Sequence, residues 1–304
     1  MKLIALRALT AAVETGSLRS AARVLDLSQP VVTKIIRELE VELGASLLQR
    51  STRGVVPTVQ GQVLFEQARR SLHDLDGAAV RVQQLGGQMV GELAVGAVPL
   101  AVLLLIPETL RTFSAAFPAI RLRISEELYI AQLERLRQGS VDVAVGGIPH
   151  GLASGEFVIE PLLTTRMVVV VRHGSCWARA RSLKELSEAK WVYTGASAQD
   201  GYAKQLYASH DLPAPTVGAV VNSTLALLSL VGSGDFVGLM PVQIAHHPVC
   251  AQYLQTVPIR EQGLSLQVGA IVRRDAVMSP AVRQFITHLH RAAHHVTQAS
   301  SLSL

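Results

Sequence analysis

Residues 16–44 of this 304-residue chain carry the pattern that most constrains its fold, GSLRSAARVLDLSQPVVTKIIRELEVELG. Small or apolar residues recur at helical spacing at Leu18, Ala21, Ala22 and Leu25. That spacing places them on one face of a short helix, which they would bury. The segment after this helix contains Ser28, Gln29 and Pro30. Ser28 is suited to cap a second helix from about Gln29, because its hydroxyl can accept from a free N–H, and Pro30 is tolerated there.

The second helix has one apolar and one polar face. Its expected buried stripe is Val32, Ile35, Ile36, Leu39 and Leu43. The residues that then face outward are Gln29, Pro30, Thr33, Lys34 and Arg37. Glutamine can bond to adenine, lysine and arginine to guanine or phosphate, and the threonine methyl can contact thymine. The face therefore favours DNA reading, but these residues alone also fit a helical hairpin whose Lys34 and Arg37 are only solvated.

The flanking segments supply the rest of a small domain. Leu3, Leu6, Leu9 and Val13 predict an amphipathic helix ahead of the pair. Residues 46–50 and 55–56 predict two short strands around a turn that contains Gly54, which together would form a wing. Arg50 and Arg53 lie at or beside this turn, where they could reach phosphates or a minor groove.

These segments resemble the winged helix-turn-helix of LysR-type transcriptional regulators. The matching residues are Leu6, Leu9, Gly16, Ser17, Ala21, Ala22, Leu25, Ser28, Gln29, Pro30, Ile36, Leu39, Glu40, Leu43, Gly44, Leu47, Leu48, Arg50, Arg53, Gly54, Thr58 and Gly61. The chain departs from the family at Leu18, Thr33, Lys34 and Gln60, which bears on the preferred base sequence rather than the binding mode. The resemblance implies DNA contacts from Ser17, Arg19, Ser28, Gln29, Pro30, Thr33, Lys34, Arg37, Arg50 and Arg53.

A long helix is predicted after Thr58, because no proline occurs before Gly86 and Gly87. Its apolar stripe is Leu64, Ala68, Leu72, Leu75, Ala79 and Val82. Such a helix would reach roughly 40 Å and needs a partner for its stripe. Packing against the chain's own larger domain would satisfy it. In the family, however, this linker helix pairs two subunits, which implies a homodimer or homotetramer on double-stranded DNA whose operator has dyad symmetry.

The remainder of the chain alternates between strand-like and helix-like stretches. Strands are expected at residues 93–97, 120–125, 141–145, 167–171, 191–194, 216–221, 236–239 and 264–272, and helices at residues 107–117, 130–138 and from Ser279 onward. This rhythm predicts parallel strands with crossover helices. The family resemblance implies a two-lobed α/β domain similar to periplasmic binding proteins, with chain crossings near residues 161–166 and 263–267.

We therefore expect an α/β protein with three parts. A winged helix-turn-helix would occupy residues 1–58, a linker helix residues 59–88, and a two-lobed effector-binding domain residues 91–304. Lobe I would comprise about residues 91–162 and 267–304, and lobe II about residues 163–266.

An effector cleft is expected at the carboxyl ends of the strands, where loops and helix N-termini offer free N–H groups. The candidate lining residues are Val98, Pro99, Leu100, Tyr129, Gly147, Ile148, Ser197, Ala198, Asn222 and Ser223. Each has a purely structural alternative, since Gly147 fits a turn and Asn222 and Ser223 fit a helix cap. Relatives that sense aromatic acids often carry a hydroxyl residue at the position of Leu100 and a smaller residue at that of Tyr129, which implies a different effector here.

Several other classes of protein are disfavoured. Neither a G-x-S-x-G nor a G-x-G-x-x-G motif is present, which argues against an enzyme and against a cofactor. The longest apolar run, residues 93–106, is short for a bilayer, and no export signal is evident, so a cytoplasmic protein without membrane contact is expected. An α/β enzyme with an attached DNA-binding domain, and an effector-independent DNA-binding protein, remain as alternatives.

Two further patterns are weighed against structural explanations. Cys176 and Cys250 are far apart in sequence, which favours idle thiols over a redox pair. His290 and His294 are one helical turn apart and could share a metal ion, but a solvated terminal helix is favoured, and no metal is expected.

Overall fold

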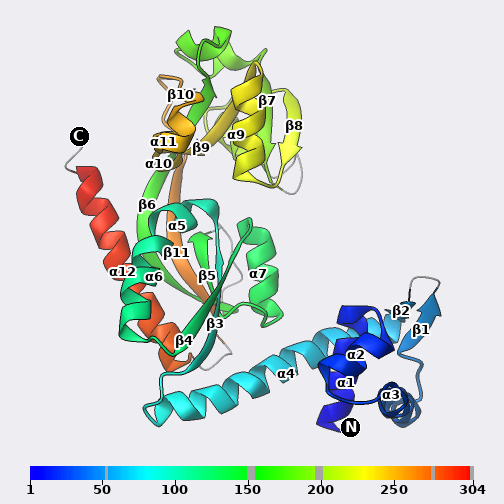
Figure 1. The fold of residues 1–304 in the computed structure, drawn as a ribbon. Helices are drawn as coiled ribbons and strands as arrows, with labels where there is room; N and C mark the ends of the chain where they lie inside the picture. Colours follow the sequence, from blue (N-terminus) through cyan, green and yellow to red (C-terminus); the bar gives the residue numbers. More distant parts are fainter. Residues whose placement is uncertain (52–53, 149–154, 196–200, 275–277, 302–304) are drawn as a thin grey trace. The chain divides into compact units, whose positions relative to one another are not determined.

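A computed structural model describes residues 1–51, 54–148, 155–195, 201–274 and 278–301 (Figure 1). The chain divides into two compact units. The first comprises Met1–Gln88 with Arg137–Ser140, and the second comprises Met89–Leu136 with Val141–Leu304.

The first unit contains the predicted helix-turn-helix, wing and long helix. Its elements are α1 (Leu3–Thr15), α2 (Leu18–Val24), α3 (Gln29–Leu43), β1 (Leu48–Ser51), β2 (Gly54–Pro57) and α4 (Val59–Leu85). The first three helices enclose a small core of Ala8, Ala11, Ala12, Ala21, Ala22, Val32 and Ile36. Both α1 and α3 end at a glycine in the left-handed conformation, Gly16 (φ 65°) and Gly44 (φ 63°). Glycine carries no Cβ, so the chain can reverse there without strain.

Two details of the first unit differ from the sequence predictions. Ser28 is the N-cap of α3, but its hydroxyl makes no capping hydrogen bond, so that prediction was wrong. Pro30, at the second helical position, has no N–H and removes one of the two donors that a capping oxygen uses. The buried stripe of α3 is also shorter than predicted, because Leu43 is 44% exposed while Val32, Ile36 and Leu39 are buried.

The apolar stripe of α4 is only partly covered within one chain. Phe65, Ala68 and Leu72 are buried, and Leu6 of α1 packs with Ala68 and Leu72. Further along the helix, Leu75 is 53% exposed and Val82 is 70% exposed. The C-terminal half of α4 therefore presents apolar side chains that this unit does not bury.

The second unit is built on one mixed sheet. Its strands are β3 (Gly91–Ala97), β4 (Ile120–Glu126), β5 (Val143–Gly147), β6 (Phe157–Arg172), β7 (Lys190–Thr194), β8 (Val217–Val221), β9 (Phe236–Pro241), β10 (Leu254–Thr256) and β11 (Ser265–Arg273). The order across the sheet is β4-β3-β5-β11-β6-β9-β7-β8, with β10 paired to β6.

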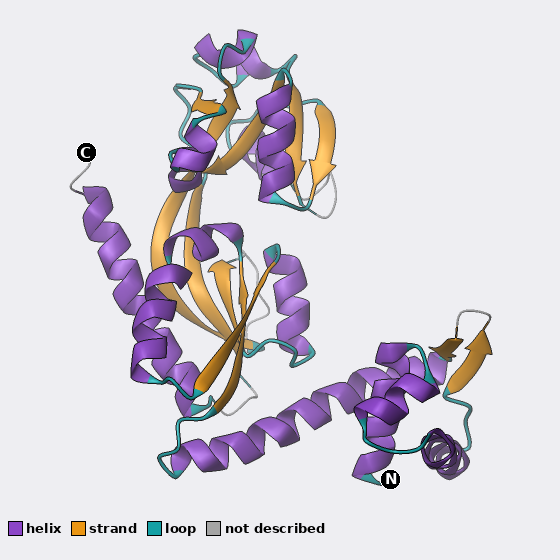
Figure 2. Ribbon diagram, in the orientation of Figure 1, coloured by secondary structure: helices purple, strands orange, loops and turns teal. Residues whose placement is uncertain are grey.

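Helices cover both halves of this sheet (Figure 2). They are α5 (Pro99–Leu104), α6 (Ile106–Ala116), α7 (Tyr129–Arg137), α8 (Tyr202–Ala208), α9 (Thr224–Ser233), α10 (Val242–Ala245), α11 (Pro248–Ala251) and α12 (Pro280–Ser301), together with two short 3-10 helices, Cys176–Arg179 and Lys184–Leu186.

The expectation of parallel strands holds only within each half of the sheet. β3 pairs in parallel with β4 and β5, and β7 pairs in parallel with β8 and β9. The two long central strands, β6 and β11, are antiparallel to each other, and each is antiparallel to its outer neighbour. They carry the chain from one half to the other and back, and they are neighbours in the sheet, with Arg166 opposite Ser265.

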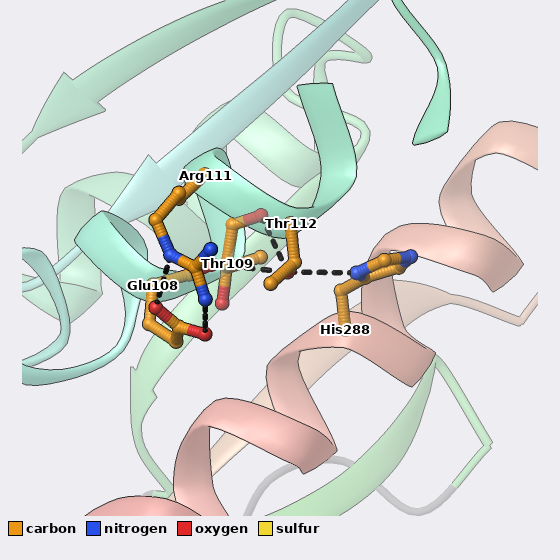
Figure 3. Close-up of polar contacts among 5 residues, drawn as sticks. All are labelled: Glu108, Thr109, Arg111, Thr112 and His288. Carbon is orange, nitrogen blue, oxygen red and sulfur yellow. Dashed lines mark hydrogen bonds and ion pairs between the residues drawn. The ribbon is translucent and has the colours of Figure 1, made fainter. Parts of the chain in front are cut away.

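A histidine is buried where α12 packs on α6 (Figure 3). His288 is 6% exposed, and its Nδ1 lies 2.8 Å from the Thr112 hydroxyl. That hydroxyl is 3.0 Å from the Glu108 carbonyl oxygen and can donate to it, while it accepts from Nδ1 of His288 whenever that nitrogen carries a proton. The rings of Phe113 and Phe117 meet the imidazole edge-on. Burial lowers the pKa of His288 below its usual 6.5, and Arg291 adds to the effect.

We expect His288 to make the fold sensitive to acid. Because its pKa is lower in the folded than in the unfolded chain, unfolding takes up a proton below pH 6.5, and stability falls as the pH drops. Thermal unfolding at about pH 7.5 and about pH 5.5 should show a smaller loss for His288→Gln than for the parent. His294→Gln, at an exposed position of the same helix, is the control and should lose as much as the parent. Equal losses in all three proteins would contradict the assignment.

Candidate nucleic-acid interface and effector cleft

The polar face of α3 is exposed, as its sequence predicts. Gln29, Pro30, Lys34 and Arg37 are exposed, and Thr33 is half-buried. The Thr33 hydroxyl donates to the Gln29 carbonyl at 2.9 Å. Lys34 Nζ lies 3.9 Å from Glu38 Oε1, an exposed pair that solvent screens, so Lys34 remains available to an outside anion.

An open hollow runs along this same face. It is lined by Gln29, Pro30, Thr33, Lys34, Arg37, Glu38, Val41 and Glu42. Glu38, Val41 and Glu42 were missed in the sequence interpretation, although they follow Lys34 and Arg37 at helical spacing. The face therefore differs in charge along its length: the cations Lys34 and Arg37 lie nearer the N-terminus of α3, and the carboxylates Glu38 and Glu42 lie nearer its C-terminus. A phosphate backbone is therefore favoured near the helix N-terminus, where the helix dipole is also positive.

The other predicted contacts of the helix pair lie at helix starts. Ser17 is the N-cap of α2, and its hydroxyl accepts from the Ser20 N–H at 3.3 Å. Arg19 is exposed on α2. Ser28 is exposed at the start of α3 and leaves its hydroxyl uncommitted to capping.

The wing is attached to the helix pair at its second strand. The Val55 N–H donates to the Gly16 carbonyl at 2.8 Å. Gly54 has a φ of 126°, and a Cβ added there would lie 2.3 Å from the same carbonyl oxygen. Glycine is therefore required for this approach. Arg50 lies in β1 opposite Val55, whereas Arg53 lies outside the described residues.

Four predicted effector residues lie at one end of the first half of the sheet: Val98, Pro99, Gly147 and Ile148. The Val98 N–H donates to the Val145 carbonyl at 3.0 Å, and a Cβ on Gly146 would lie 2.7 Å from a methyl of Val98. The Ile148 N–H donates to the Gln267 carbonyl at 2.8 Å. Val98, which follows β3, therefore lies beside β5, and Ile148, which follows β5, is bonded to the crossing strand β11. Pro99 and Gly147 are their neighbours in the chain.

Among the described residues, no hydrogen bond joins the remaining effector candidates to Val98 or Ile148. Leu100 is buried in the apolar core, and Tyr129 begins α7. Ser223 caps α9 by accepting from the Ala226 N–H at 3.4 Å, which is its structural alternative, while Asn222 beside it is exposed. Both follow β8 at the far edge of the sheet. Ser197 and Ala198 lie outside the described residues.

Other chemistries find little support in the described part of the chain. Across residues 1–51, 54–148, 155–195, 201–274 and 278–301, no group of three or more metal-ligating side chains is arranged to hold an ion. His290 lies 3.9 Å from Glu160, and the two cysteines are free, with Cys176 exposed and Cys250 buried. Burial raises the pKa of the Cys250 thiol, which disfavours its reactive thiolate. Within the same described residues, no helix is long and apolar enough to span a membrane.

Two family models match the chain. Residues 3–62 match the bacterial regulatory helix-turn-helix protein, lysR family, and residues 86–294 match the LysR substrate binding domain. The chain belongs to the LysR family. This LysR-type chain is thus a DNA-binding transcriptional regulator with a substrate-binding effector domain, and not an enzyme.

Named relatives agree with this assignment. The HTH-type transcriptional regulator GalR of Pseudomonas putida is 30% identical over 90% of this chain and 71% of its own length. The regulator TfdS of Cupriavidus pinatubonensis is 29% identical, over 92% of this chain and 95% of its own. Among solved structures, the LysR family regulator CbnR shares the fold with a TM-score of 0.70 at 22% identity, over 96% of this chain and 99% of its own. CbnR has also been solved in complex with its target DNA.

Gly54 allows a direct test of how the wing is attached. We expect Gly54→Ala to weaken binding to all DNA sequences similarly, because the added methyl strains a backbone conformation that costs roughly 1–3 kcal/mol for other residues and displaces the wing from Gly16. Fluorescence anisotropy with specific and random duplexes measures the effect. Gly77→Ala is the control, since Gly77 lies inside α4 and its nearest neighbour is a flexible Arg81 side chain. Full binding by Gly54→Ala would contradict this account.

Proposed function

We propose that the outward face of α3 reads the operator in a DNA major groove. The observation that carries this proposal is the exposed row of Gln29, Lys34 and Arg37 on a helix whose opposite face is buried. Gln29 is suited to adenine, and Lys34 and Arg37 to guanine or phosphate. Because the Thr33 hydroxyl already donates within the helix, its methyl group is the part suited to a thymine methyl. Further contacts to the DNA backbone would come from Ser17, Arg19, Ser28, Pro30, Arg50 and Arg53.

We further propose three working parts in each subunit: a DNA-binding domain at residues 1–58, a linker helix at residues 59–88, and an effector domain at residues 91–304 with lobes divided near residues 162 and 267. The two compact units divide between Gln88 and Met89, which supports an effector domain that begins after α4. The C-terminal half of α4 also exposes apolar side chains, among them Leu75 and Val82. Pairing of α4 between two subunits would cover these side chains and set two α3 helices about a two-fold axis, as a dyad operator requires. We therefore propose a homodimer or homotetramer. Because its target is DNA, we propose that it acts in the cytoplasm.

The effector is proposed to bind where β3 and β5 end, at Val98, Pro99, Gly147 and Ile148, and to change DNA binding or bending. Coupling requires only that the effector bind one arrangement of the two lobes more tightly than the other. Thermal unfolding in the presence of small-molecule candidates tests this role. If no compound shifts unfolding or alters DNA binding, the alternative of an effector-independent DNA-binding protein is favoured.

Gln29→Ala tests base reading. We expect it to reduce discrimination between the selected operator and random DNA by about 1–3 kcal/mol, because one bidentate base contact is lost while phosphate contacts remain. Gln284→Ala, at an exposed position of α12, is the matched control and should change neither affinity. Equal losses on operator and random DNA would show that Gln29 does not read a base.

Leu75→Glu tests pairing through α4. We expect the dimer to dissociate, because the substitution would place a charge in an apolar seam where it has no partner. Sedimentation velocity measures the change. Gln67→Glu adds the same charge at an exposed polar position of α4 and should sediment as the parent does. A Leu75→Glu protein that also sediments as the parent would exclude this seam.

A further inference from the structure

Residues 46–48 connect α3 to α4, because this segment makes polar contacts with Glu40 of α3 and with Thr58 at the start of α4. α3 packs mainly against α1 and α2, and α4 packs against α1. Between α3 and α4 lies the short segment that leads into the wing. Its central residue, Leu47, is 1% exposed and packs in a cluster with Leu39 of α3 and Leu64 of α4.

On the α3 side, one carboxylate oxygen holds this segment. Glu40 Oε1 accepts from the Leu47 N–H at 2.8 Å and from the Leu48 N–H at 3.2 Å, and the Ser46 hydroxyl lies 3.4 Å away. Leu47 directly precedes β1 and Leu48 begins it, so these backbone donors lie where the wing starts. Because one side-chain oxygen accepts from two consecutive backbone N–H groups, Glu40 fixes the start of the wing relative to α3.

On the α4 side, the first turn of the helix holds the same segment. The Thr58 hydroxyl donates to the Ser46 carbonyl at 2.7 Å and accepts from the Gly61 N–H at 3.0 Å. The Thr58 N–H donates to the Leu47 carbonyl at 2.9 Å. Gly61 lies so close that an added Cβ would be 1.8 Å from the Leu47 carbonyl oxygen. The segment is therefore fixed to α4 as closely as it is to α3.

We propose that Glu40 is a positioning residue that sets the orientation of α3 relative to α4, and so the spacing between the two operator half-sites that a dimer accepts. This inference rests on the proposed function, in which α4 pairs two subunits and α3 reads DNA. Glu40 makes no base contact in this role. It links the orientation of α3 to that of α4, because residues 46–48 are hydrogen-bonded to Glu40 of α3 and to Thr58 at the start of α4.

The test uses the full-length protein and an operator selected from random DNA by the parent protein. Affinity is measured for that operator and for versions in which the half-site separation is lengthened or shortened by one base pair. The parent should prefer its own spacing strongly. Glu40→Ala should bring the ratio of affinities toward one while keeping its discrimination against base changes under α3. Glu40→Gln keeps an acceptor oxygen and should restore the preference, and Glu14→Ala, at an exposed position of α1, should leave it intact.

A ratio separates positioning from general destabilisation. If Glu40 served only the stability of the fold, Glu40→Ala would lower the affinity for every spacing by one factor and leave the ratio unchanged, which would overturn the proposal. An unchanged ratio in a fully stable Glu40→Ala protein would overturn it as well. If Glu40→Ala does not fold, a Glu40→Gln protein that has lost the preference overturns it, because that variant retains the acceptor. Failure of the parent to select any sequence would instead reject the operator model from which this role follows.

Discussion

The first unit depends on the burial of α1 on nearly all of its sides. One side of this helix, rich in alanine, packs against α2 and α3, and the other packs against α4 through Leu6. Small side chains let the neighbouring helices approach closely, so a thirteen-residue helix can serve as the centre of a small domain. Because the apolar faces of α2 and α3 are used on α1, their polar faces are left to solvent. The exposure of Gln29, Lys34 and Arg37 is thus a consequence of core packing rather than of any feature of those residues.

Sequence periodicity was sufficient to locate a helix where that helix has one buried face. It located α1, α3 and α4 to within a residue or two, and Gly54 marked the wing turn. It could not supply strand direction, since side chains alternate in the same way in parallel and antiparallel strands. The antiparallel pair β6 and β11 was therefore unforeseen. Capping also failed at Ser28, because the pattern identifies the residue but not whether its hydroxyl finds a donor.

The two sets of site residues also differ in how far the sequence could predict that they lie together. Those on α3 lie within one helix, so spacing alone places them together, and only Glu38, Val41 and Glu42 were overlooked on that face. The effector candidates come from loops that are distant in the sequence, and their proximity depends on the sheet order. Val98 is held beside β5 and Ile148 beside β11 by hydrogen bonds that no local pattern encodes. Leu100, by contrast, contributes to the core, where an apolar residue is needed regardless of any ligand.

The central pair of strands imposes a further constraint on the second unit. β6 and β11 belong to both halves of the sheet, and one apolar cluster includes residues of both, from Val95 and Phe113 to Leu227 and Met240. A movement of one half against the other must therefore bend these two strands or shear that cluster. Shearing the cluster would expose apolar surface, at a cost of roughly 25 cal/mol for each Å² exposed. An effector that acts on this domain is consequently expected to work through small rotations about β6 and β11. Such rotations would be sensed at Val98, which bonds to β5 beside this axis, and at Ile148, which bonds to β11 itself.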